Sequence, residues 1–597
     1  MLKTLCLITI MCGSVTMTSS AIATPWPATD ALGRAVSTAE TVGPPRKDRF
    51  VGIFYFLWLG EHGRGGPYDI SKILHNDPDA INHPESPLWG PVNAFHHWGE
   101  PLLGYYLSDD PWVLRKHAQM LSDAGVDTVI FDVTNQATYA KNYLALCKVW
   151  SQVRKEGGAT PQIAFLTPFW DPHNVVRTLY DDFYSKGLYK DLWFQWKGKP
   201  LILADPAKVD DDVKGFFTFR KPQPSYFEGP TGPDQWSWLE VYPQHVFKNS
   251  AGESEQMTVG IGQNGILPDR CAAFTEKGAH GRSWHDGAED TSPGAVNLGL
   301  NVTEQWERAL KIDPEFIFIT GWNEWIAMNL PSFNGVSKPP MFVDQFTQEY
   351  SRDMEPMTGG HGDSYYYQMV DYIRRFKGAP PIPKASAPKT VKIDGSFGDW
   401  KGVSPEYRDD IGDTEHRNHP AWAKAESYTN TTGRNDFVTL KVARDAKFIY
   451  FYARTREPIT PHTDLNWMLL FINTVRQRPN SLGYNYVVNR TVLDGSVTIL
   501  EEHGARQPWG TLVYGGHDIR TEPSRIVWHS KQGVHYAVKG DELELAIPRK
   551  ALGFGDLSKP IRFDFKWADN IQKFDPIEFT VNGDTAPNGR FAYRYQE

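Results

Sequence analysis

Cysteine is scarce in this sequence of 597 residues, which contains only four. Two of these, Cys6 and Cys12, lie in the first 23 residues. Secreted proteins that depend on a disulfide framework carry many more cysteines, so we expect core size to stabilise this chain. The other two, Cys147 and Cys271, could pair, and the sequence leaves that open.

Long hydrophobic runs are also missing after residue 23, which argues against a membrane-spanning helix. The N-terminus itself has Lys3, a short apolar stretch from Leu5 to Met17, and the small-x-small site Ala21-Ile22-Ala23. This pattern is typical of a cleaved secretory signal, so we expect residues 1–23 to be a signal peptide. The protein is therefore predicted to be secreted or periplasmic.

No block of basic residues occurs, and the formal net charge is −9. Nucleic acid and anionic membrane surfaces are therefore not expected as partners. Aromatic residues make up 13% of the chain, including 21 Trp and 26 Tyr. They can serve as core or as stacking surfaces for sugars, and we expect a monomer with a poly- or oligosaccharide partner.

The chain divides at a proline-rich stretch, residues 378–390, which we expect to be a linker. Before it, residues 45–377 alternate apolar strand patterns, such as 50–60, with helical patterns, such as 110–125. This alternation predicts an α/β fold, a (β/α)8 or TIM barrel. A doubly wound open sheet is the alternative, but the chain lacks its Gly-rich dinucleotide turn.

After the linker, residues 391–597 change to a period of two between turn residues, with no long helical pattern. We expect an all-β sandwich, jelly-roll-like, as a second domain.

Polar residues at the ends of the barrel strands are the candidates for chemistry, because barrel active sites lie there. The clearest case is FIFITGWNEWIA (Phe316–Ala327), where Glu324 ends a buried strand between two indoles. Glycoside cleavage needs two carboxyl groups, one with a raised pKa, together with aromatic and amide contacts to the sugar. The residues expected to contact substrate are Trp322, Asn323, Trp325, Trp238, Tyr242, Trp170, Asp171, Gln263 and Asn264.

The second carboxylate is expected from another strand end, with Glu240 ahead of Asp132. A strand-end acid can equally form a structural ion pair or a helix N-terminal contact, and that alternative stays open for each of them. His280, His285 and Asp286 fit no standard zinc spacing. We expect neither a metal nor a cofactor.

The Trp-Asn-Glu-Trp motif, with the preceding WERALKIDPEFIFIT, resembles glycoside hydrolases of families 71 and 99 over roughly residues 46–377. The resemblance implies a (β/α)8 catalytic domain acting on carbohydrate, with Glu324 in the active site. Members of this group carry a second carboxylate three residues after the Glu, where this chain has Ala327. The partner acid must therefore come from elsewhere, or the barrel binds sugar without cutting it.

The second domain resembles carbohydrate-binding module family 9 through residues 391–413 and the strand patterns that follow. Such modules often bind structural calcium, but the segment expected to carry the ligands, residues 475–485, has no carboxylate. Sugar-binding aromatics could come from the set Trp467, Tyr484, Tyr486, Trp509 and Trp567, although alternation buries every second side chain.

The sequence thus predicts a secreted, endo-acting glycoside hydrolase that uses Glu324 and a second acid. The alternatives are a non-catalytic carbohydrate-binding protein with a degenerate barrel, favoured by Ala327, and a sugar-transferring enzyme on the same barrel.

Overall fold

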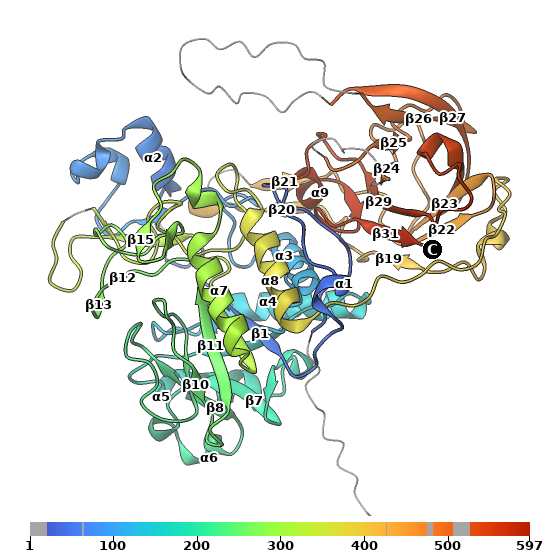
Figure 1. Ribbon diagram of the computed structural model, residues 1–597. Helices are drawn as coiled ribbons and strands as arrows, with labels where there is room; N and C mark the ends of the chain where they lie inside the picture. The colour runs from blue at the N-terminus through green and yellow to red at the C-terminus, as the bar shows by residue number, and fades with distance from the viewer. Residues whose placement is uncertain (1–20, 63–64, 339, 425–426, 475–481, 505–525) are drawn as a thin grey trace, which may run out of the picture.

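The computed structural model describes residues 21–62, 65–338, 340–424, 427–474, 482–504 and 526–597. Most of the expected signal peptide, part of the expected calcium segment and Trp509 lie outside these ranges. Figure 1 shows two parts, a helix-covered sheet in blue to yellow and an all-β part in orange and red. The predicted order, an α/β part followed by an all-β part, is confirmed.

Parallel strands form the core of the first part, because their near-continuous apolar sequences can be buried on both faces. Neighbouring strands follow the order β11-β16-β1-β4-β5-β7-β8-β9. Within the described residues these eight are β1 (Phe50–Tyr55), β4 (Thr128–Asp132), β5 (Gln162–Leu166), β7 (Lys199–Leu203), β8 (Thr218–Gln223), β9 (Gln235–Ser237), β11 (Ser254–Gly260) and β16 (Phe316–Thr320).

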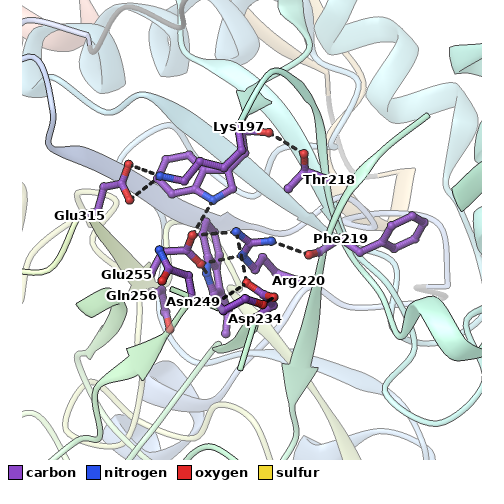
Figure 2. Close-up of polar contacts among 12 residues, drawn as sticks. Lys197, Thr218, Phe219, Arg220, Asp234, Asn249, Glu255, Gln256 and Glu315 are labelled. Carbon is purple, nitrogen blue, oxygen red and sulfur yellow. Dashed lines mark hydrogen bonds and ion pairs between the residues drawn. The ribbon is translucent and has the colours of Figure 1, made fainter. Parts of the chain in front are cut away.

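The sheet is nearly closed between β9 and β11, where side chains make the connection. Gln256 accepts a hydrogen bond from the Ser237 amide at 3.1 Å and donates one to the Ser237 carbonyl at 3.0 Å. Arg220 on β8 and Glu255 on β11 form a buried two-pronged ion pair, with contacts of 2.6 and 2.7 Å (Figure 2). Trp236 of β9 donates to the same Glu255 carboxylate at 2.8 Å. A backbone hydrogen bond from the Asp234 amide, just before β9, to the Lys248 carbonyl at 3.0 Å adds to them. These contacts join the two edges of the sheet without a continuous backbone ladder.

Helices cover this sheet incompletely. The longest ones are α3 (Pro111–Ala124), α4 (Ala140–Lys155), α7 (Leu300–Ile312) and α8 (Ser364–Lys377), with the shorter α5 (His173–Leu179) and α6 (Asp211–Lys214). As predicted, α3 starts with an Asp110 cap and Pro111, and it ends at Gly125 in the left-handed region, at a φ of 84°. Among the described residues no helix follows β8 or β9, so the predicted helix after every strand is not found.

A small second sheet lies where β16 ends. Its order is β18-β17-β3-β2, with β17 (Ile326–Leu330), β18 (Met341–Phe342), β3 (Phe95–His97) and β2 (Tyr68–Asp69). Because β17 starts two residues after Glu324, this sheet fixes the chain that leaves the strand end.

The main sheet of the C-terminal part is antiparallel and ordered β19-β22-β23-β28-β27-β26-β25-β24-β29-β30, with β31 beside β29, and a separate two-stranded sheet pairs β20 (Arg417–His419) with β21 (Tyr428–Asn430). The strands are β19 (Tyr407–Arg408), β22 (Phe437–Arg444), β23 (Phe448–Thr455), β24 (Leu469–Asn473), β25 (Tyr486–Val488), β26 (Val497–His503), β27 (Trp528–Lys539), β28 (Glu542–Pro548), β29 (Arg562–Asp569), β30 (Asp584–Ala586) and β31 (Tyr593–Gln596).

This sheet curls into a barrel-like shape, since its ends meet. Tyr407 on β19 donates to the Arg594 carbonyl on β31, and Tyr593 donates back to the Arg408 carbonyl. The candidate sugar-stacking aromatics Trp467, Tyr484, Tyr486 and Trp567 are all buried, and they pack in the core rather than on a binding face.

The two parts are packed together through several contacts. Arg417 and Asp110 form a buried ion pair at 2.7 Å. The proline-rich residues 378–390 have no helix or strand, but Ala379 donates to the Gly43 carbonyl and Ala385 to that of Gln596. The stretch is therefore fixed to both parts.

Within the described residues, no helix has both the length and the apolar character needed to cross a membrane. Cys147 and Cys271 are both free thiols, so they do not pair.

The contact between Arg220 and Glu255 predicts how strongly the barrel depends on its closure. Arg220→Met leaves a buried Glu255 charge without its partner, which should cost ~3–5 kcal/mol of stability and lower the melting temperature by ~3–6 °C. Lys197→Met is the matched control, because Lys197 and Glu315 form a more exposed pair worth ~0–1 kcal/mol. Equal melting temperatures for the two variants, measured by calorimetry, would contradict this role of the buried pair.

Candidate active site

A cavity of about 550 Å³ lies where β4, β5 and β16 end. Its lining contains three carboxyl groups and one guanidinium, from Asp132, Glu324, Asp344 and Arg352. Its walls are largely aromatic, from Phe54, Trp58, Phe95, Phe169, Tyr226 and Trp238. A mostly apolar hollow with a few converging polar groups is the usual form of a small-molecule site.

Glu324 is held in this cavity through its backbone. The turn after β16 is paired with a segment further along the chain, so that Gly321 donates to the Arg352 carbonyl at 2.7 Å and Met354 donates back to Gly321 at 3.0 Å. The Glu324 amide donates to the Asp353 carboxylate at 2.7 Å. These bonds fix the backbone from which the Glu324 side chain enters the cavity.

Glu324 is 6% exposed, and burial raises the pKa of its side chain well above the usual value of a glutamate. The carboxylates of Asp344 and Asp353 raise the pKa further, while Arg352 partly offsets the shift. Its Oε2 accepts from Arg352 Nε at 3.1 Å and from Gln345 Nε2 at 3.4 Å. Glu324 therefore tends to hold a proton although a cation lies beside it.

Arg352 connects the polar groups of the site. Besides Glu324, its guanidinium donates to Asp344 Oδ1 at 3.1 Å and to Asn264 Oδ1 at 3.1 Å. It also lies over the Trp238 ring, 5.5 Å from the ring centre. The buried Arg352 guanidinium thus contacts two carboxyl groups and the amide of Asn264, a residue that the sequence predicted to bind substrate.

Asp132 ends β4, as predicted from the sequence, and lines the same cavity. Its Oδ1 accepts from the Thr134 amide at 3.0 Å and from the Thr134 hydroxyl at 2.7 Å. Burial raises the pKa of Asp132, and the charge of Asp344 adds to the shift, while the Thr134 hydrogen bonds oppose it.

Glu240, the first candidate for the second carboxylate, is outside the cavity. It is fully buried, and its carboxylate accepts from the His245 amide at 2.7 Å and from His245 Nδ1 at 3.0 Å. Gln305 of α7 donates to its carbonyl at 3.0 Å. Strand β9 ends at Ser237, so at Glu240 the chain has already turned away from the strand end and toward α7. The Glu240 carboxylate forms a structural ion pair with His245 there.

The two indoles flanking Glu324 do not wall it in as expected. Both are fully buried beneath the site. Trp325 stacks on Trp98 at 4.6 Å between ring centres, and Trp322 packs edge-on against His117 at 5.5 Å. The aromatic wall near Glu324 comes instead from other parts of the chain, Trp58 and Trp238.

Of the remaining residues that were predicted to bind substrate, some are buried in the interior and others lie on the surface. Asn323 accepts from the Phe56 amide at 2.9 Å, and Gln263 accepts from Asn301 at 2.9 Å, both in the interior. Trp170 is 70% exposed and packs edge-on against Phe169, a cavity residue, which places it near the rim. Tyr242 and Asp171 are exposed and are not among the cavity-lining residues described.

Asp344 and Arg352 are site residues that the sequence did not indicate. Asp344 follows the two-residue strand β18, and Arg352 lies in the segment after it, so neither ends a recognisable strand pattern. An acid and a base eight residues apart in a polar loop give no signal of their own.

No protein-family model matches the chain, and no curated protein sequence matches it. Two solved structures of the GH99 endo-alpha-mannosidase from Bacteroides thetaiotaomicron are similar to it, one of them in complex with BIS-TRIS-propane. Each is 16% identical over 55% of this chain and 97% of its own, with TM-scores of 0.31 and 0.34. A likeness this weak carries no information about substrate or mechanism, so the cavity itself must supply both.

Removing the shared cation should destabilise the site. Arg352→Met removes an ion pair with the half-exposed Asp344 and a buried hydrogen bond to Glu324, so we expect a loss of ~2–3 kcal/mol and a melting temperature lower by ~2–3 °C. Adding Glu324→Gln should change the melting temperature little further, because a protonated Glu324 carries no charge to lose. A single variant that melts like the wild type would show that Arg352 does not hold the site together.

Proposed function

We propose that this protein is a glycoside hydrolase that uses Glu324 and a second carboxylate in the cavity. The observation that carries the proposal is the meeting of three carboxyl groups, one guanidinium and an aromatic wall in a single hollow at the strand ends. Barrel enzymes place their chemistry at this end of the strands, and glycosidic cleavage requires an acid and an anion on the two sides of one bond.

Glu324 fits the general acid, because a carboxyl group with a raised pKa can keep its proton at a pH where other acids have lost theirs. Both of its described hydrogen bonds use Oε2, which leaves Oε1 for the glycosidic oxygen. Protonation of that oxygen lets the leaving part of the glycan depart as an alcohol, with the glycosidic oxygen as its new hydroxyl group.

Asp344 is our choice for the second carboxylate. Its side chain is 46% exposed and forms an ion pair with Arg352. Since only Oδ1 is bonded to Arg352 in the described structure, Oδ2 can activate water or stabilise the developing positive charge of the sugar. Asp132, held by Thr134, is placed to bind a sugar hydroxyl.

Trp58 and Trp238 supply flat apolar surfaces on which sugar rings can pack. We further propose that the nearly closed sheet is a TIM barrel that has lost some helices, and that the enzyme acts within polysaccharide chains. A secreted or periplasmic monomer, and a second domain related to carbohydrate-binding module family 9, remain proposals that rest on the sequence.

Sugar binding without cleavage is the alternative, and one feature of the site favours it. Ala327, at the position where the resembled families carry an acid, is buried and cannot take part in chemistry. If the Arg352 ion pair keeps Glu324 charged, the cavity would hold a glycan without cutting it. Release of new reducing ends from a panel of polysaccharides distinguishes the two functions.

Glu324→Gln should lower turnover by a factor of ~10³ or more while leaving glycan binding intact, because the amide keeps the shape but has no proton to give. Reducing-sugar release and binding calorimetry measure the two effects on the same preparation. Unchanged release by this variant would remove Glu324 from the reaction.

Asp344→Asn should cost ~10²–10⁴ in turnover, the range for loss of an acid–base group, while Asp132→Asn should mainly raise KM. Glu240→Gln is the matched control and should cleave like the wild type, because its only described partners are structural. An inactive Glu240→Gln variant that folds normally, or an active Asp344→Asn variant, would contradict this assignment.

A further inference from the structure

A buried acidic cluster lies far from the cavity, in the C-terminal part. Asp409, Asp413 and Asp584 each offer a carboxylate oxygen, and these oxygens all lie within 4.8 Å of one another. Asp413 is 4% exposed and Asp584 2%. Charges of one sign this close and out of water repel strongly, so they need a counter-charge or a shared ligand.

The hydrogen bonds of the cluster leave one oxygen of each acid unused. Asp584 Oδ2 accepts from the Phe437 amide at 2.7 Å, and Asp413 Oδ2 accepts from Gln119 Nε2 at 3.0 Å. The second oxygens, Oδ1 of Asp413 and Asp584 and Oδ2 of Asp409, are buried without a hydrogen-bond partner in the described structure. Buried polar atoms are rarely left this way unless a ligand completes them.

A fourth acid, Asp436, lies next to the cluster. It is 7% exposed, and its Oδ2 accepts from the amide of Gly412, the residue before Asp413, at 2.8 Å. Its Oδ1 is buried and has no hydrogen-bond partner among the described residues.

The cations already present do not neutralise the cluster. Lys566 is fully buried, and its ammonium donates to the Pro587 carbonyl. Arg456 is half-exposed and lies 3.8 Å from Asp436. Among the described residues, none of Asp409, Asp413 and Asp584 forms an ion pair with a lysine or an arginine.

We propose that Asp409, Asp413 and Asp584 bind one calcium ion, and that this ion helps to hold the C-terminal part on the barrel. Calcium takes about 6–8 oxygen ligands at ~2.3–2.6 Å, so opposite ligands lie at most ~5 Å apart, as the 4.8 Å spread of the cluster allows. Magnesium prefers a tighter octahedron with several waters. The site was not expected from the sequence, and it differs from the segment at residues 475–485.

The barrel takes part through helix α3. Gln119 on α3 holds the Asp413 carboxylate, and Asn588 bridges Asp123 of α3, at 3.4 Å, to Asp410, at 2.9 Å. Residues that orient a metal ligand affect affinity nearly as much as the ligands do. Calcium binding and docking of the two parts should therefore favour each other.

The test uses the full-length protein, stripped with EGTA and titrated with CaCl₂ by calorimetry. We expect one calcium per chain and a melting temperature at least ~5 °C higher at saturating calcium than in EGTA. Absence of binding heat together with an unchanged melting temperature would overturn the proposal, and would show that protons neutralise the cluster.

Variants locate the site. Asp413→Asn and Asp584→Asn should each weaken calcium binding at least ~100-fold, while the exposed Asp556→Asn should bind like the wild type. Gln119→Leu should weaken binding about tenfold if the barrel contributes. Wild-type affinity in both cluster variants would exclude these acids as ligands, and wild-type affinity in Gln119→Leu would exclude the link to the barrel. If the variants do not fold, the titration of the wild type still decides whether calcium binds.

Discussion

The site depends on one buried cation. Arg352 donates to Glu324 and to Asp344 at 3.1 Å each, and it is itself almost fully buried. This cation offsets part of the effect of burial on the pKa of Glu324. It therefore holds a carboxyl group with a raised pKa beside a second carboxyl group, Asp344, with which it forms an ion pair, and glycosidic cleavage as proposed needs two such acids.

Arg352 can do this only because the chain around it is fixed. Its carbonyl and the amide of Met354 pair with the turn at Gly321, so the segment that carries the cation also holds the turn that carries Glu324. That turn follows β16, whose position in the ring depends on closure between β9 and β11 through Glu255 and Gln256. The chemistry at the strand ends is in this way coupled to side-chain contacts on the far side of the barrel.

Much of the fold could be predicted because the burial of strands and helices determines the spacing of apolar residues in the sequence. Apolar strands alternating with helices, and then a change to period two, gave the order of the two parts. The incomplete helices and the curled C-terminal sheet could not be predicted, since they depend on how the strands pair rather than on any one segment. The sequence placed Asp132 and Glu324 at the ends of β4 and β16, and in the structure both line one cavity.

The rest of the site could not be predicted for a related reason. A strand end shows where a side chain starts but not where it points, which is why Trp322, Trp325 and Glu240 face the interior. Asp344 and Arg352 come from a loop whose shape is set by pairing with a distant turn. The acidic cluster likewise joins residues that are far apart in the sequence, Asp409 and Asp584, and only the folded sheet brings them together.

The pH dependence of kcat/KM for glycan hydrolysis tests the central claim most directly. A protonated Glu324 as acid predicts a bell-shaped profile whose alkaline limb reflects a group with a pKa well above that of an ordinary carboxyl, because the rate falls as this proton is lost. A rate that rises through the range of ordinary carboxyl groups and then stays constant to alkaline pH would contradict it, since no essential proton would then be held in the cavity.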